Sequence, residues 1–342
     1  MTPTAIAVAL DGMGGDHAPA APVAGALEAA REGVAVLLVG DEPVLAAELR
    51  RQGAAGAPGI ELVHAPDIVS SDEEGARAVR AKPDSSVSLA CRLVGDGRAG
   101  AAVSAGNTGA TLAAATLHMR RIPGVIRPAI AVALPSAGGR PVLLLDAGAS
   151  AEARTEHFPQ LALMGRLFAR DVLGIGEPRV GLLSIGEEDV KGSETVLAAH
   201  ALLRGTPGFA GNVEGRDILS GAVDVVVTDG FTGNVVLKTM EGTAGFLLGE
   251  VRAAVGSTLP GRIGGLLVRP AMRRMRERID PESYGGAVLL GVRGLAVIGH
   301  GNSSGRGVAN AVRMAARGTR ERLVAHFAEA LAHEGAERSP AA

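Results

Sequence analysis

Polar residues and glycines follow short apolar runs at five places, and their types are suited to binding an anion. Residues 11–17 (Asp-Gly-Met-Gly-Gly-Asp-His) hold three glycines in four positions, which let the backbone approach a ligand closely. The carboxylates of Asp11 and Asp16 and the imidazole of His17 leave the same loop. The alternative interpretation is a tight turn in which the two Asp residues act as caps.

The second group, residues 104–109 (Ser-Ala-Gly-Asn-Thr-Gly), comes between an apolar run and an expected helix over 110–119. Free backbone N–H groups at a helix start, together with Ser, Asn and Thr donors, form an anion-binding site. The loop matches neither a Walker A motif nor a dinucleotide fingerprint. The alternative is an ordinary helix N-cap made by Asn107 or Thr108.

Three further loops carry possible partners for the anion. Residues 185–192 hold three acids and Lys191, which would act as a point charge on a phosphate or pair with the acids in a solvated turn. Residues 228–234 again lead from a strand into a helix, with Lys238 one turn further. His300 stands between glycines in residues 299–304, open to a ligand or simply on the surface.

These loops give two sets of candidate residues. The expected catalytic residues are His17, Asn107, Lys191, Asn234 and His300. The expected substrate-binding and phosphate-binding residues are Asp11, Gly14, Gly15, Asp16, Ser104, Gly106, Thr108, Gly109, Asp229, Gly230, Phe231, Gly233 and Lys238. The histidines show no metal-ligand spacing, and Cys91 has helical neighbours and no activating pattern, which favours a buried small hydrophobe.

Short apolar runs ending in Gly, Asp or Ser must position these loops. They are 6–10, 34–39, 101–103, 130–134, 142–145, 180–183, 223–227 and 295–298. Alternation of such runs with Ala- and Leu-rich helical segments predicts an α/β fold, a mostly parallel sheet sandwiched by helices. The turn at 136–139 predicts one antiparallel pair within it. We expect a single catalytic domain over 1–335 and a tail at 336–342.

Composition limits the class of protein. The chain has 342 residues, 47% of them hydrophobic, and a formal net charge of -2. Such a chain buries a sizeable core, and it lacks the excess of cations that wholesale nucleic-acid binding requires. Aromatic residues make up only 2%, so base-stacking platforms are scarce. A single Cys and the absence of a secretory or membrane-spanning pattern predict a cytoplasmic protein.

Residues 236–280, called the arm below, differ from the rest. Apolar residues at helical spacing predict two helices, with a Gly/Pro interruption through 257–265 between them. We expect a protruding helical hairpin that serves a homodimer. Apolar residues beside cations suit insertion into an anionic lipid surface or binding of an acidic partner. The residues expected to make these contacts with the membrane or an acidic partner protein are Arg262, Ile263, Leu266, Leu267, Arg269 and Arg273.

Taken together, the loops resemble those of the phosphate acyltransferases of bacterial phospholipid synthesis. The segments that carry the resemblance are 11–19, 104–110, 211–217, 228–231, 284–287 and the His300-Gly301 loop, in order along nearly the whole chain. Ser184 departs from the usual Asn of the family. The resemblance implies a fold related to phosphotransacetylase and to the isocitrate and isopropylmalate dehydrogenases, and a homodimer.

The resemblance also implies the reaction, in which acyl-[acyl carrier protein] and inorganic phosphate give acyl phosphate and free carrier protein. Phosphate must be bound and aimed at a thioester carbonyl, and the oxyanion needs preorganised donors. We expect direct attack by phosphate, no cofactor and no metal. The acyl phosphate would pass to a downstream acyltransferase, helped by peripheral contact with the membrane. The alternatives are a phosphotransacetylase-like enzyme using acyl-CoA, a dehydrogenase on a related fold, and a non-catalytic membrane-surface scaffold for the carrier protein.

Overall fold

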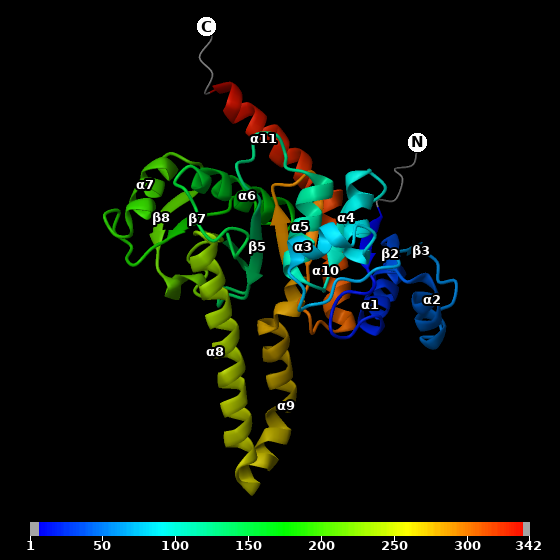
Figure 1. Cartoon of the computed structure of the whole chain (residues 1–342). Helices are drawn as coiled ribbons and strands as arrows, with labels where there is room; N and C mark the ends of the chain where they lie inside the picture. Colours follow the sequence, from blue (N-terminus) through cyan, green and yellow to red (C-terminus); the bar gives the residue numbers. More distant parts are fainter. Residues whose placement is uncertain (1–6, 338–342) are drawn as a thin grey trace.

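One large sheet organises the chain, which the computed structural model describes from residue 7 to residue 337 (Figure 1). The sheet has 11 strands in the order β3-β2-β1-β4-β11-β10-β5-β6-β9-β7-β8. The strands are β1 (Val8–Asp11), β2 (Val36–Gly40), β3 (Ile60–His64), β4 (Ala101–Ser104), β5 (Ala129–Leu134), β6 (Val142–Leu145), β7 (Val180–Leu183), β8 (Phe209–Val213), β9 (Val225–Val227), β10 (Ala287–Leu290) and β11 (Leu295–Ile298).

The predicted apolar runs are confirmed as strands, although Ile6 lies outside the described residues. Three strands lay outside these runs: β3, which follows the loop at 53–59, and β8 and β10. Strand β8 contains Gly211 and the polar Asn212, which interrupt its apolar pattern, and the apolar run of β10, which follows Gly285 and Gly286, was not identified.

The sheet consists of two parallel blocks that run in opposite directions. Strands β3, β2, β1, β4 and β11 are parallel to one another and form the first block. Strands β6, β9, β7 and β8 form the second parallel block, and β10 and β5 lie between the two. The predicted antiparallel pair across the 136–139 turn is confirmed as β5 with β6. The expectation of one such pair was wrong, because β10 is also antiparallel to both β5 and β11.

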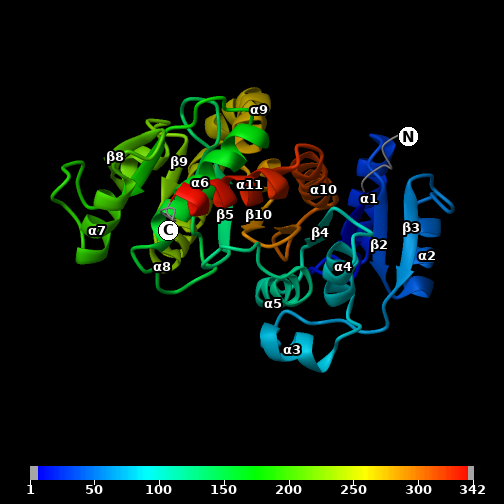
Figure 2. The ribbon, with the colours of Figure 1, turned by 90° about the horizontal axis from the view of Figure 1, so that it is seen from above.

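Helices cover both faces of the sheet (Figure 2). They are α1 (Ala20–Arg31), α2 (Glu42–Arg51), α3 (Gly75–Ala81), α4 (Ser86–Gly95), α5 (Thr108–Met119), α6 (His157–Asp171), α7 (Glu194–Leu203), α8 (Gly230–Gly256), α9 (Leu259–Ile279), α10 (Gly305–Arg320) and α11 (Leu323–Glu337). In Figure 2, α1, α6, α10 and α11 lie on one side of the strands, and α3, α4 and α5 on the other. Helix α11 includes residues 336 and 337, which were expected to belong to the tail.

Two apolar cores result from this arrangement. In β1, Val8 and Leu10 belong to one core while Ala9 belongs to the other, because successive side chains of a strand point to opposite faces. Cys91 is fully buried in the second core, as predicted, and burial raises the pKa of its thiol. Burial on both faces explains why the strands are continuous apolar runs.

Helices α8 and α9 form the protruding hairpin predicted for the arm (Figure 1). The predicted Gly/Pro interruption was wrong, because only Ser257 and Thr258 separate the helices. The Thr258 hydroxyl caps α9 by accepting from the Gly261 N–H, at 3.1 Å. Pro260 falls in the first turn of α9, where its missing N–H costs no intrahelical bond. The glycines at 261, 264 and 265 are therefore helical.

Candidate active site

The carboxyl ends of β1 and β4 are joined by a buried hydrogen bond. The Ser104 hydroxyl donates to Asp11 Oδ2 over 2.7 Å, and the Met13 N–H donates to Asp11 Oδ1 over 3.1 Å. Burial raises the pKa of Asp11, and these donors partly offset that effect. A Cβ on Gly14 would lie 2.5 Å from Asp11 Oδ2, so only glycine fits there. Asp11 thus holds the glycine loop against the loop after β4.

The loops that carry His17 and His300 lie side by side. The Asp16 N–H donates to the Gly301 carbonyl over 2.7 Å, and the Gly299 N–H donates to the Ser104 carbonyl over 2.8 Å. Both histidine side chains reach solvent, His17 from an exposed turn and His300 with 39% of its side chain exposed. Two imidazoles predicted from separate motifs therefore flank the same end of the first block.

Asn107 caps helix α5, which confirms the N-cap interpretation of this loop. Its Oδ1 accepts from the Ala110 N–H at 2.9 Å. Its Nδ2 donates to the Ser70 carbonyl at 3.1 Å and to the Glu73 carbonyl at 2.8 Å. The amide therefore fastens residues 70–73 beside the start of α5, and exposed Thr108 and Gly109 present the positive end of the helix dipole. Asn107 as a direct oxyanion donor stays a prediction.

The second block carries its own cluster where β6 and β9 end. Asp229 caps α8, accepting from the Thr232 N–H at 2.8 Å and from the Thr232 hydroxyl at 2.6 Å. Gly233 packs so tightly on Asp146 that an added Cβ would lie 1.9 Å from the Asp146 carbonyl oxygen. Asn234 lies over Gly148, and Phe231 is exposed. This loop is built like the first, with an Asp cap and glycines in close contact.

Asp146 organises this cluster and was absent from the predicted set. Its carboxylate accepts backbone N–H bonds from Ile130, Gly148, Ala149 and Ser150, at 2.9 to 3.1 Å. Burial raises the pKa of this carboxyl, and the four donors oppose the effect. Arg127, also unpredicted, donates to the Ser150 hydroxyl over 3.3 Å. The signal available in the sequence was an Asp directly after an apolar run and before the small residues Ala-Gly-Ala-Ser, much as Asp11 precedes a glycine-rich loop.

Lys191 lies in the exposed loop between β7 and α7. The predicted pairing of Lys191 with the acids of its own loop does not occur among the described residues: Glu187 meets Arg216 at 3.5 Å, and Asp189 meets Arg204 at 2.6 Å. The Lys191 backbone closes the loop instead, with its carbonyl accepting from the Ser184 hydroxyl at 2.9 Å. Within residues 7–337, no hydrogen bond or ion pair joins Lys191 to the histidine loops.

Helix α8 connects the two clusters. It begins at the cluster after β9 and brings Lys238 and Glu241 to the His300 loop. Glu241 Oε2 is 2.8 Å from Lys238 Nζ, and Glu241 Oε1 is 3.8 Å from His300 Nε2. Glu241 Oε1 is buried and accepts no hydrogen bond from the described residues. Sequence reasoning named Lys238 and His300 and missed the carboxylate between them, because Glu241 sits in an ordinary helical stretch.

Comparison with solved structures defines the class of this fold. The chain superposes on a phosphotransacetylase from Streptococcus pyogenes with a TM-score of 0.62 and 14% identity, covering 92% of this chain and 94% of that one. A branched-chain phosphotransacylase from Enterococcus faecalis superposes with a TM-score of 0.57 and 14% sequence identity. The match covers 92% of this chain and 99% of that one. This is the α/β fold of the phosphotransacetylases, as expected.

The chain belongs to the phosphate acyltransferase family. The sequence profile described as "Fatty acid synthesis protein" matches residues 6–325. A phosphate acyltransferase from Heliobacterium modesticaldum is 46% identical over 94% of this chain and 96% of its own length. A phosphate acyltransferase from Anaeromyxobacter sp. is 47% identical over 95% of this chain and 90% of its own length. Membership makes the chain an acyltransferase of phospholipid synthesis and confirms the resemblance seen in its loops.

Proposed function

We propose that this chain transfers a fatty acyl group from acyl-[acyl carrier protein] to inorganic phosphate, producing acyl phosphate. One phosphate oxygen attacks the thioester carbonyl, a C–O bond forms, and the C–S bond breaks to release the carrier thiolate, which takes a proton from solvent. A thiolate leaves readily, so the chain's main tasks are to hold the reactants together and to stabilise the oxyanion. The observation that carries the proposal is the exposed start of α5 beside the His17 and His300 loops.

The proposed roles follow the two clusters. Thr108 and Gly109 at the start of α5 would hold phosphate with their backbone N–H groups, because helix N-termini attract anions. His17 and His300 would position phosphate or polarise the carbonyl oxygen. Asn107 would act on phosphate through the 70–73 loop that it fastens. Asn234 and Lys191 would approach from the second block, the side on which the proposal places the acyl carrier protein.

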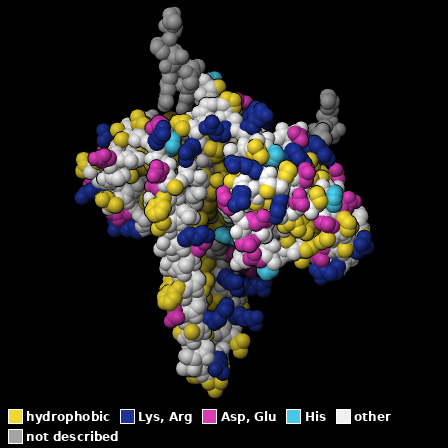
Figure 3. Space-filling view, in the orientation of Figure 1, with side chains coloured by type: hydrophobic (Ala, Val, Ile, Leu, Met, Phe, Trp, Pro, Cys, Tyr) yellow, Lys and Arg dark blue, Asp and Glu magenta, His cyan; other side chains and the backbone are white. Residues whose placement is uncertain are grey.

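The arm is proposed to contact the membrane and a second copy of the chain. Its tip is defined as Ile263, Leu266, Leu267 and Val268. The exposed fractions of these residues are 56%, 68%, 78% and 50%. Figure 3 shows apolar side chains at the free end of the hairpin and Lys and Arg side chains along its flank. Apolar groups ringed by cations suit an anionic lipid surface. No described helix is both long and apolar enough to cross a bilayer.

The rest of the arm supports the homodimer proposal. Leu247 on α8 is 55% exposed and in line with the face that carries Val236 and Met240 onto the core, and Phe246 beside it is 66% exposed. A second copy would cover this apolar stripe. Two of the predicted cations have local partners, since Arg262 Nε donates to the Gly256 carbonyl at 2.8 Å and Arg273 meets Glu277 at 3.2 Å. Arg269 is the cation best placed for a lipid headgroup or an acidic carrier protein. The protein would thus be cytoplasmic and peripheral, delivering acyl phosphate to a downstream acyltransferase.

One assay tests the proposed function. The purified chain is incubated with acyl-carrier thioester and phosphate, and acyl phosphate is trapped with hydroxylamine. We expect phosphate-dependent hydroxamate, lowered by His17→Ala and by His300→Ala while the fold persists. Hydroxamate formed from acyl-CoA and not from the carrier thioester would favour the phosphotransacetylase-like alternative. Carrier-protein binding without any hydroxamate would favour the scaffold.

A further inference from the structure

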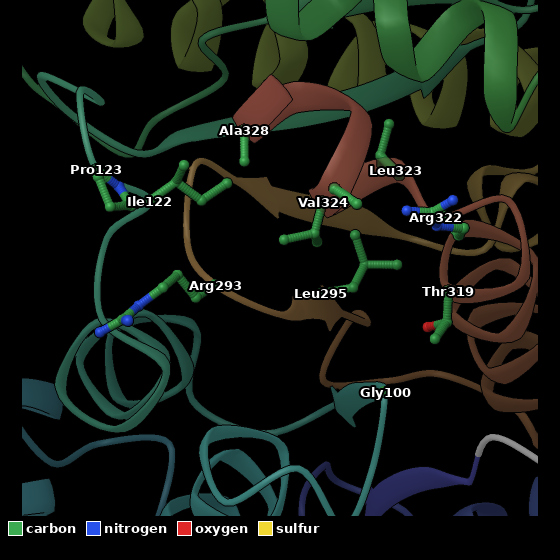
Figure 4. Close-up of a pocket in the computed structure, with 12 residues that line it drawn as sticks. Gly100, Ile122, Pro123, Arg293, Leu295, Thr319, Arg322, Leu323, Val324 and Ala328 are labelled. Atoms are coloured by element: carbon green, nitrogen blue, oxygen red, sulfur yellow. The ribbon is translucent and has the colours of Figure 1, made fainter. Parts of the chain in front are cut away.

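A cavity lies at the opposite ends of the strands that carry the candidate site. It has a volume of about 390 Å³ and is bordered by Gly100 and Leu295, where β4 and β11 begin (Figure 4). Ser104 and His300 stand at or beyond the other ends of these two strands. The cavity is therefore separated from the His17 and His300 loops of the candidate site by the length of these strands, about 13 Å at 3.3 Å per residue.

The walls of the cavity are mostly carbon. Ile122, Leu295 and Leu323 are buried side chains that line it, and Val324 and Ala328 of α11 close it from the other side (Figure 4). The same Ile122, Leu295 and Leu323 also line a smaller hollow that continues toward Phe327. A space of this kind favours an aliphatic chain, because transfer of apolar surface from water is favourable.

Two arginines flank this apolar space. Figure 4 shows Arg293 and Arg322 on opposite sides of the cavity, and both are exposed. Among residues 7–337, the Arg293 guanidinium has no hydrogen-bond or ion-pair partner. Arg322 meets only Glu329, at 3.6 Å, and the side chains of this pair are 68% and 61% exposed. Exposed pairs of this geometry contribute little, so both cations are available to a ligand.

Arg322 also adopts a strained backbone conformation. It forms the turn between α10 and α11 with φ at 55°, in the left-handed region. Arg120 is the other non-glycine residue of the described chain with positive φ, and its carbonyl accepts from the Arg293 N–H at 2.9 Å. Glycine would adopt such a conformation without strain. Strain of this kind gathers at binding sites, where the side chain has a task that glycine does not perform.

We propose that this cavity is a second ligand site for an aliphatic anion, with the chain among Ile122, Leu295 and Val324 and the charged head at the rim by Arg293 and Arg322. The apolar walls select the chain, and the two exposed guanidinium groups select a carboxylate or phosphate head. The site lies at the opposite strand ends from the start of α5 and the histidine loops, where phosphate is proposed to bind, so such a ligand would act on the protein without occupying the phosphate site.

Calorimetric titration of the full chain tests the proposal with decanoate and decyl phosphate as anionic probes and decanol as the uncharged control. We expect both anions to bind the parent protein more tightly than decanol. Val324→Phe fills the cavity and should weaken binding of all three probes at least tenfold. Arg293→Ala with Arg322→Gly should weaken binding of the anions at least tenfold and leave that of decanol unchanged.

Further arms separate the outcomes. Arg322→Gly relieves the strained turn, so the midpoint of thermal unfolding without ligand should stay equal or rise, which excludes misfolding as the reason for lost binding. Titrations repeated in saturating inorganic phosphate separate this cavity from the phosphate site. No binding of decanoate to the parent protein would overturn the proposal. Binding that Val324→Phe leaves intact and that phosphate displaces would also overturn it.

Discussion

The carboxylate of Glu241 faces the imidazole of His300 across the two halves of the candidate site, with Oε1 3.8 Å from Nε2. Glu241 belongs to α8, which starts in the second block, and His300 follows β11 of the first block. The other carboxylate oxygen meets Lys238 Nζ at 2.8 Å. A buried oxygen without a donor is costly, and a ring N–H of His300 that moved closer would satisfy it. This carboxylate is therefore well placed to position His300 during turnover.

Glu241→Gln keeps the size of the side chain and removes its charge. If Glu241 positions His300, kcat for hydroxamate formation should fall about tenfold, about 1.4 kcal/mol in the transition state. KM for phosphate should not rise, because the variant removes a negative charge near an anion site. His300→Ala should lower kcat at least as much. The variant that combines Glu241→Gln with His300→Ala should have a kcat close to that of His300→Ala alone. Unchanged kcat in Glu241→Gln would show that the carboxylate is structural.

Asn107→Ala tests the loop that carries phosphate in the proposed site. The variant loses the cap of α5, worth about 1 kcal/mol of stability. It also loses the bonds to the Ser70 and Glu73 carbonyls. We expect kcat/KM for phosphate to fall, because the variant loses roughly 2–4 kcal/mol of transition-state stabilisation. Activity is measured in phosphate titrations, and stability by thermal unfolding.

Lys82→Ala serves as the matched control for Asn107. Lys82 holds the same loop through the Ile68 carbonyl at 2.9 Å and Glu73 at 2.7 Å, and it does not touch Asn107. If Asn107 works by fastening this loop, Lys82→Ala reproduces part of the loss of activity. Full activity of Lys82→Ala beside an impaired Asn107→Ala would instead indicate that the Asn107 amide acts directly on the substrate.

Two glycines of the same helix, α8, should respond oppositely to alanine. A Cβ on Gly233 would lie 1.9 Å from the Asp146 carbonyl oxygen, so Gly233→Ala must displace the loop after β6. We expect a loss of stability of more than 2 kcal/mol, together with loss of activity. Gly249 has open space around its Cβ position, and Gly249→Ala should stabilise the helix by about 0.5–1 kcal/mol. Equal unfolding midpoints for the two variants would contradict this account of the β6 loop.

The sequence predicted those parts of the site that depend on local patterns. Asp11 and Ser104 follow apolar runs directly and Asp229 follows one after Thr228, so the sequence predicted their place at strand ends, as it did the Asn107 cap. Glu241 escaped prediction because its partners, Lys238 and His300, meet it only through the path of α8 past the first block. The two directions of the sheet were missed because they depend on the antiparallel pairing of β10 with β5 and β11. Strand pairing between segments far apart in sequence leaves no local pattern.

The pair of Asp171 and His326 predicts a pH dependence of stability. Burial acts to raise the pKa of Asp171, and hydrogen bonds from Arg170 and His326 outweigh it, so this pKa lies below its usual 3.8. The carboxylate binds protons less readily in the folded state, so its contribution is present above about pH 4 and is lost as the pH falls through the lowered pKa. The parent should unfold at a higher temperature than Asp171→Asn at pH 7, and the difference should shrink on acidification. A difference that does not depend on pH would contradict this linkage.

Leu266→Glu with Leu267→Glu tests the arm. These residues are 68% and 78% exposed at the end of the hairpin, and nothing in the described chain packs over them. If the tip enters the lipid surface, binding to anionic vesicles should be lost, because carboxylates there meet both apolar chains and negative headgroups. Dimerisation and hydroxamate formation in solution should persist, since Phe246 and Leu247 lie further from the tip.

Arg269→Glu should weaken vesicle binding less than the double leucine variant does. Its effect should be larger at low salt than at high salt, because salt screens the attraction between Arg269 and the headgroups. Vesicle flotation and analytical ultracentrifugation measure the two properties separately. A parent protein that does not bind vesicles, or a double variant that dissociates into monomers, would assign the tip to an interface between copies of the chain.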